Sequence, residues 1–261
     1  MCIRDSVPPL PEGLSENRFL GGQVTLRQPR RGYRAGMDAA LLAAACDAAP
    51  GERVLEAGCG VGGALLAAAV RRPEAVFVGV ERAAQALELA RQNIEINGLG
   101  DRVSVRAGEV AEPFVRLGLP PFDLAMANPP FFDDPEALRA PAPEKAGAWM
   151  ADDGFSAWAA FLLKAVRPGG RILVIHRADR LADLLEALAA GAGSIQIRPV
   201  HPFADAPAKR VLVRAVKTGR APLRLLPPVV LHPRSGEDKH TAEAEAILRG
   251  AAGIDWAAPQ A

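Results

Sequence analysis

An alternation of short apolar runs with helical segments is the feature that most constrains the fold. Apolar runs typical of buried strands occur at residues 53–57, 75–80, 103–107, 122–127 and 171–176. Segments with helical character lie between them, at residues 63–72, 83–97, 152–167 and 179–190. This order predicts a parallel sheet with helices on both faces. A strand pair at residues 195–200 and 211–216 completes a predicted doubly wound, seven-stranded, mostly parallel α/β fold.

One domain accounts for most of the chain. Residues 1–18 contain Pro and Gly, and we expect them to be a flexible N-terminus. A single domain is predicted for residues 19–250, beginning with a strand–turn–helix extension in which Asp38 caps the Ala- and Leu-rich helix. Residues 251–261 are predicted to be a tail.

Composition excludes several classes of protein. Hydrophobic residues make up 49% of the chain, and 31 basic residues balance 30 acidic residues, so nucleic-acid binding would need a local basic patch. No apolar stretch reaches the roughly 18 residues of a membrane span, and the N-terminus lacks the apolar segment of a secretion signal. The three cysteines and four histidines have no metal-ligand spacing. We therefore expect a cytoplasmic protein without a metal.

A glycine-rich loop follows the first strand of the alternating pattern. Glu56 is followed at every second position by Gly58, Gly60 and Gly62, and the stretch also matches the Gly-x-Gly-x-x-Gly dinucleotide pattern. Glycines let the backbone approach a ligand closely, and Glu81 at the end of the next strand is placed to bind two ribose hydroxyls. This arrangement predicts a nucleoside ligand.

Glu56 distinguishes between the candidate nucleosides. A carboxylate at the end of the first strand repels a pyrophosphate but suits an ammonium or sulfonium group, which favours S-adenosylmethionine over NAD. An NAD-dependent oxidoreductase is further disfavoured because the chain offers no plausible partner for hydride transfer. Glu109, after the third strand, is a candidate acceptor for the adenine amino group of the cofactor.

The fourth strand ends at the tetrapeptide Asn128-Pro129-Pro130-Phe131. Two consecutive prolines cannot continue a central strand, because neither has an N–H to donate. Asn128 is thus left at the carboxyl edge, where ligands bind in open parallel sheets. Its side-chain oxygen and the Pro129 carbonyl could accept both hydrogens of a weakly nucleophilic amino group and leave its lone pair free. Phe131 would stack on an unpaired or flipped-out base.

These motifs resemble those of class I S-adenosylmethionine-dependent N-methyltransferases, which carry [D/N/S]-P-P-[Y/F/W]. The resemblance covers about residues 19–217. Within that class, residues 20–22 and 34–42 look like the opening of the bacterial enzymes that modify adenine-N6 beside the anticodon of a valine tRNA. The resemblance implies a Rossmann-like fold, Asp38 near the cofactor, and a tRNA substrate.

Basic residues supply candidate tRNA contacts, and two other functions remain open. The candidate contacts are Arg30, Arg31 and Arg34, together with Lys209 and Arg210. One alternative is the glutamine-N5 methyltransferase of release factors, although only some 50 residues precede the first strand, fewer than its helical substrate domain needs. Another is a non-catalytic RNA-binding relative. An acidic stretch at residues 132–150 could gate the pocket.

Overall fold

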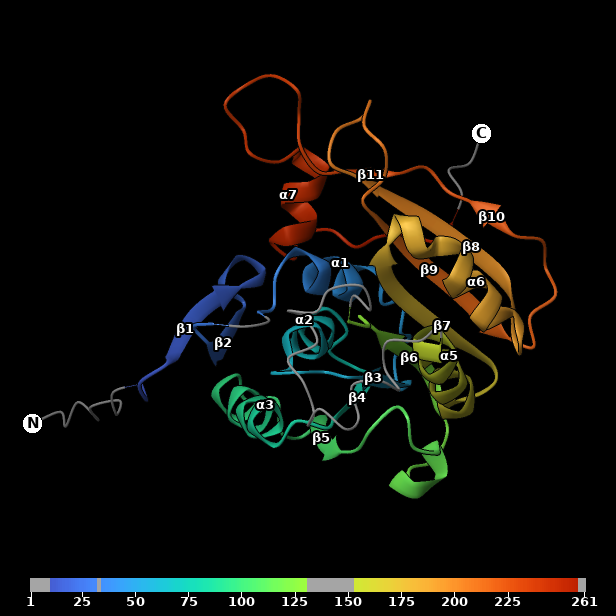
Figure 1. Cartoon of the computed structure of the whole chain (residues 1–261). Coiled ribbons are helices and arrows are strands. Elements are labelled where there is room, and N and C mark those ends of the chain that lie inside the picture. The colour runs from blue at the N-terminus through green and yellow to red at the C-terminus, as the bar shows by residue number, and fades with distance from the viewer. Residues whose placement is uncertain (1–9, 32–33, 131–152, 258–261) are drawn as a thin grey trace, which may run out of the picture.

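The computed structural model describes residues 10–31, 34–130 and 153–257 (Figure 1). Its main sheet has the strand order β10-β8-β9-β7-β6-β3-β4-β5, with β11 also pairing with β8. The strands of this sheet are β3 (Arg53–Ala57), β4 (Val76–Glu81), β5 (Val103–Ala107), β6 (Phe122–Ala127), β7 (Val166–Arg177), β8 (Ala192–His201), β9 (Arg210–Lys217), β10 (Arg224–Leu225) and β11 (Val229–Val230).

The seven longer strands form the predicted doubly wound sheet. Strands β3, β4, β5, β6 and β7 pair in parallel, whereas β9 is antiparallel to both β7 and β8. The two-residue strands β10 and β11 both pair with β8 at the outer edge, and the sequence did not predict them. The fold class predicted from the strand–helix alternation is therefore confirmed.

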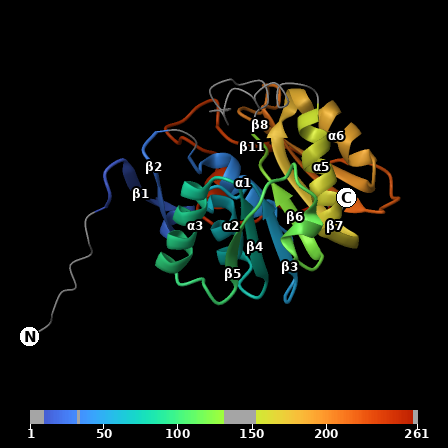
Figure 2. The ribbon, with the colours of Figure 1, turned by 60° about the horizontal axis from the view of Figure 1, so that its bottom comes forward.

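Helices cover both faces of the sheet (Figure 2). On one face lie α1 (Met37–Ala45), α2 (Gly63–Arg71) and α3 (Ala84–Ile96), and α7 (Ala242–Leu248) packs against α1. On the other face lie α5 (Asp153–Ala165), α6 (Leu181–Ala189) and the short turns η2 (Phe114–Leu117) and η3 (Ala178–Arg180). Successive strand residues alternate between two cores, so Leu173 and Ile175 pack on the first side while Ile172 and Val174 pack on the second.

The N-terminal extension is a hairpin fastened to α3. Strands β1 (Leu14–Phe19) and β2 (Val24–Pro29) pair in an antiparallel register around η1 (Leu20–Gly22). The predicted flexible terminus therefore differs from the structure at residues 14–18, which are ordered by strand pairing. Asn97 accepts a hydrogen bond from Thr25 N and donates to Thr25 O, which fixes the hairpin on the helix.

Asp38 does not cap α1, contrary to the prediction. The N-cap residue is Gly36, and its helix end has no side-chain cap. Asp38 lies in the first turn and forms an ion pair with Arg210 of β9, with 2.9 Å between Oδ2 and Nε. A carboxylate in the first turn also interacts favourably with the helix dipole. The residue therefore ties α1 to the sheet rather than starting the helix.

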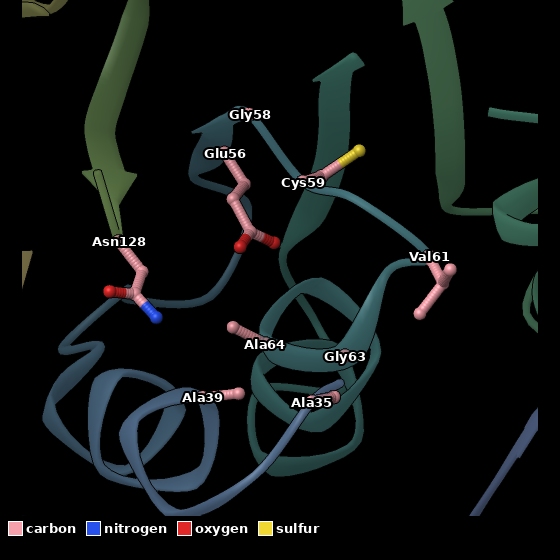
Figure 3. Close-up of a pocket in the computed structure, with 9 residues that line it drawn as sticks. All are labelled: Ala35, Ala39, Glu56, Gly58, Cys59, Val61, Gly63, Ala64 and Asn128. Atoms are coloured by element: carbon pink, nitrogen blue, oxygen red, sulfur yellow. The ribbon is translucent and has the colours of Figure 1, made fainter. Parts of the chain in front are cut away.

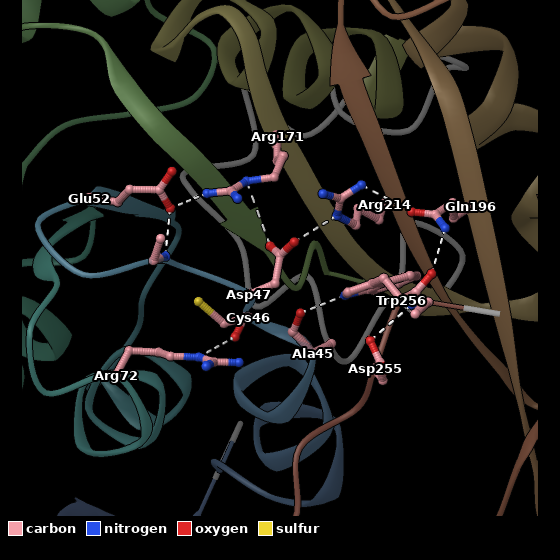
Figure 4. A network of polar contacts seen from close by, with 12 residues as sticks. Ala45, Cys46, Asp47, Glu52, Arg72, Arg171, Gln196, Arg214, Asp255 and Trp256 are labelled. Atoms are coloured by element: carbon pink, nitrogen blue, oxygen red, sulfur yellow. Dashed lines mark hydrogen bonds and ion pairs between the residues drawn. The ribbon is translucent and has the colours of Figure 1, made fainter. Parts of the chain in front are cut away.

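A polar network fastens the C-terminal segment to the edge of the sheet where β3 and β7 begin (Figure 4). Asp47 pairs with Arg214 at 3.0 Å and with Arg171 at 3.7 Å. Trp256 donates to the Ala45 carbonyl, and its own carbonyl accepts from Gln196. Because these contacts join segments far apart in sequence, residues 251–256 are part of the folded domain.

None of the helices within the described ranges is long and apolar enough to cross a lipid bilayer.

The network predicts a specific loss of stability. Asp47→Asn removes the charge shared by two half-buried arginines, and we expect the free energy of unfolding to fall by about 1–3 kcal/mol. The matched control is Glu112→Gln, in an exposed pair with Arg116, which should cost no more than about 0.5 kcal/mol. Urea denaturation of both variants measures the difference. Equal losses would show that the network adds nothing beyond an ordinary surface ion pair.

Candidate active site

The glycine loop and Asn128 lie side by side at the carboxyl edge of the sheet. Strands β3 and β6 are neighbours in parallel register, with Ala57 opposite Ala127. The sheet runs from β3 through β4 to β5 on one side and from β6 to β7 on the other. This is the switch point of the strand order, where ligands bind in open α/β sheets.

A pocket opens between these strand ends (Figure 3). It encloses about 40 Å³. In Figure 3 the Glu56 carboxylate and the Asn128 amide point toward the same space, above Ala39 and Ala64. The lining residues are Ala35, Ala39, Glu56, Gly58, Cys59, Val61, Gly63, Ala64 and Asn128.

Glu56 is a buried carboxyl, and only one of its two oxygens has a hydrogen-bond partner among the described residues. Its side chain is 3% exposed, and Oε2 has no hydrogen-bond partner among the described residues. Burial raises its pKa well above the usual value, a hydrogen bond from the Leu65 backbone opposes this, and the nearby Glu81 adds to the rise. A buried oxygen without a donor is costly, so this end of the pocket suits a cationic or hydrogen-bond-donating group.

Two glycines are required by close packing. A Cβ atom at Gly58 would lie 2.6 Å from the Trp158 ring, and its φ of +64° also disfavours a side chain. A Cβ atom at Gly63 would lie 2.3 Å from the Cβ of Ala35. The loop is thus wedged between α5 and the residues before α1. Gly60 and Gly62 also have positive φ.

Glu81 holds the glycine loop in this structure. One carboxylate oxygen accepts from Gly60 N at 2.9 Å, and the other accepts from Ala83 N at 2.8 Å. These bonds leave further acceptor capacity on both oxygens. The predicted binding of ribose hydroxyls by Glu81 stays a prediction. Its hydrogen bonds to the backbone N–H groups of Gly60 and Ala83 were not predicted from the sequence.

Two of the remaining predicted ligand residues form ion pairs, and their predicted roles toward the cofactor stay predictions. Glu109 pairs with Arg82 at 3.2 Å, so its negative charge is already partly balanced. Asp38 pairs with Arg210. Pro129 is buried directly beyond Asn128, and Phe131 and residues 132–150 lie outside the described residues.

Asn93 and Cys59 belong to the site although the sequence analysis did not select them. Asn93 is fully buried, and its amide donates to the carbonyls of Val61 and Arg27, which joins the glycine loop to the N-terminal hairpin. An amide on the apolar face of α3 was the available signal. Cys59 lines the pocket, and burial raises the pKa of its thiol, so it behaves as a packing residue.

Most of the predicted phosphate contacts have internal roles. Arg30 donates to the Leu14 carbonyl, and Arg34 donates to Ser15 and Asn17 within the hairpin. Arg31 and Lys209 are exposed. In the described part of the chain, no group of three or more His, Cys, Asp or Glu side chains could hold a metal ion.

The comparisons with known proteins agree with this geometry. Residues 48–200 match the family model described as "Methyltransferase domain". A solved structure of a predicted O-methyltransferase from Agrobacterium tumefaciens aligns with a TM-score of 0.70 and 26% identity, over 83% of this chain and 98% of that one.

Two kinds of curated relative match. The tRNA1(Val) (adenine(37)-N6)-methyltransferase of Cronobacter sakazakii is 32% identical over 51% of this chain and 54% of its own length. The release factor glutamine methyltransferase of Chlorobaculum tepidum is 29% identical over 60% of this chain and 56% of its own length. The chain thus spans about half the length of each of these relatives.

The raised pKa of Glu56 predicts how stability depends on pH. Above the usual carboxyl pKa the unfolded chain loses the Glu56 proton while the folded protein keeps it, so this group makes stability fall as the pH rises. Glu56→Gln removes that decline. We expect the variant's unfolding free energy, relative to the parent, to increase from pH 4.5 to pH 8 in urea titrations. A constant difference would mean that Glu56 ionises normally.

Proposed function

Because this chain belongs to the methyltransferase domain family, we propose that it transfers a methyl group from S-adenosylmethionine to an amino nitrogen, with adenine-N6 of a tRNA as the acceptor. The match confirms the predicted family and its cofactor, S-adenosylmethionine. The acceptor and the residues assigned to it are our proposal.

The residues at the pocket fit this cofactor. Its ammonium and sulfonium groups are cationic, and the buried Glu56 carboxyl provides an oxygen that has no partner among the residues described. Gly58, Gly60 and Gly62 keep side chains out of the loop, and Glu81 is available to a ribose. When bound, S-adenosylmethionine supplies an electrophilic methyl group, whose S–C bond breaks as the new N–C bond forms.

The observation that carries the proposal is the position of Asn128 beside Glu56 across two paired strands. An exocyclic amino group is a weak nucleophile because its lone pair is delocalised into the ring. The Asn128 side-chain oxygen and the Pro129 carbonyl would accept its two hydrogens and orient the nitrogen toward the pocket. No strong base is needed, since the proton can leave to water after the transfer.

The choice of tRNA rests on the relatives and on local charge. Enzymes named for adenine-N6 methylation of a valine tRNA are among the matches, and Lys209 and Arg31 are exposed. Arg177, Arg180 and Arg210 all contribute positive potential at His176, next to the Asn-Pro-Pro turn. A phosphate backbone would be attracted to this edge.

A glutamine amide of a release factor is the second candidate, because a release factor methyltransferase also matches. An amide nitrogen is as weak a nucleophile as the amino group of adenine, so the same turn would serve both. Incubation with radiolabelled S-adenosylmethionine, bulk tRNA and release factor separates the two. Label in N6-methyladenosine supports our proposal, whereas label only in protein contradicts it.

Two variants separate the roles proposed for the pocket. Asn128→Ala should bind S-adenosylmethionine normally in calorimetry but lose about a hundredfold or more in kcat, because the acceptor nitrogen is no longer oriented. Glu56→Gln should instead weaken cofactor binding by about tenfold or more, since a charge-assisted contact is lost. If Asn128→Ala lost cofactor affinity instead of turnover, its assignment would be wrong.

A further inference from the structure

The turn after β6 has few backbone donors with which to fix its own shape. Pro129 and Pro130 have no N–H, so two successive residues offer only carbonyl oxygens. Yet the proposed chemistry requires the Asn128 side chain and the Pro129 carbonyl to be held in one arrangement. A donor from elsewhere in the fold would help to hold the turn.

His176 is placed to be that donor. It lies next to the last residue of β7, the parallel neighbour of β6, and is 1% exposed. Its Nε2 atom is 3.5 Å from the Pro130 carbonyl oxygen. The imidazole meets the Phe155 ring edge to face, with 4.7 Å between centroids and 73° between planes, which restricts its rotation.

The chemistry of the contact determines which nitrogen carries a hydrogen. Burial and the charges of Arg180, Arg210 and Arg177 lower the pKa of His176 to about 4, although the Pro130 carbonyl opposes this shift. The ring is therefore neutral at physiological pH and has a single N–H. A carbonyl oxygen can only accept, so a hydrogen bond between the two groups requires that hydrogen to lie on Nε2.

We propose that His176 is a positioning residue, which donates from Nε2 to the Pro130 carbonyl and thereby holds the Asn128-Pro129-Pro130 turn in the arrangement that presents the acceptor nitrogen. His176 contacts Pro130; in this proposal it contacts neither the cofactor nor the methyl acceptor. The kinetic part of this inference rests on the proposed function. Loss of the donor should therefore lower turnover and leave the binding of cofactor and acceptor unchanged.

Three variants test this role with valine tRNA transcript as the acceptor. His176→Leu removes the donor at similar volume, and we expect kcat to fall about ten- to a hundredfold, with KM for tRNA and Kd for the cofactor within about twofold. His176→Gln keeps an N–H donor and should recover most of the lost turnover. Ile172→Val is the control. Ile172 is buried on the same face of β7 as His176 but nearer the start of the strand, so this variant should retain the parental kcat.

Several kinetic results would contradict the proposed role of His176. Parental kcat in His176→Leu would overturn the inference. So would an equal loss in His176→Gln, or a loss of kcat in Ile172→Val that matches the loss in His176→Leu, since either result would indicate general damage to packing.

A measurement on the parental protein covers the case in which His176→Leu does not fold. Nitrogen-15 NMR of labelled histidine distinguishes the two neutral tautomers, and comparison with His176→Gln assigns the signal. We expect Nε2–H at pH 7; a bare Nε2 would contradict the hydrogen bond. This measurement needs no acceptor, so its outcome is independent of whether tRNA proves to be the substrate.

Discussion

The site depends on a carboxyl that the fold buries without fully satisfying it. Glu56 sits at the end of the central strand, where the parallel pairing with β6 and the packing of α2 exclude water. Its Oε2 atom has no partner within the described residues, and such a group costs stability. A bound ligand can supply the missing partner, so we interpret the unsatisfied oxygen as preorganisation for the cofactor, whose cationic groups would favour the ionised carboxylate.

The Asn128 side of the pocket likewise has an excess of hydrogen-bond acceptors. Asn128 and the two following prolines present oxygens and few donors, which suits a substrate that brings its own N–H groups. The two prolines also leave the turn with few backbone donors of its own. Neighbouring β7 supplies His176 against this turn, so the strand order that creates the site also provides the residue that we propose stabilises it.

Much of this arrangement could be predicted from sequence because local patterns determine it. Apolar runs identified the strands, and two adjacent prolines located the end of β6. Long-range partners could not be predicted in this way. Asp38 looked like a helix cap, but its partner Arg210 is 172 positions away, and the hydrogen bond from Arg34 to Asn17 across the hairpin was not predicted either. Asn93 stood out only as an amide on the apolar face of α3, and its partners could not be predicted because they are backbone groups of two other segments.

The buried amide of Asn93 has a consequence for cooperativity. It holds the backbone of Arg27 in the hairpin and of Val61 in the glycine loop at the same time, so neither segment can shift without disturbing the other. A macromolecule that moves the hairpin and a small molecule that moves the loop would then alter each other's affinity by the same factor. One side chain thus links the position of the hairpin to that of the glycine loop.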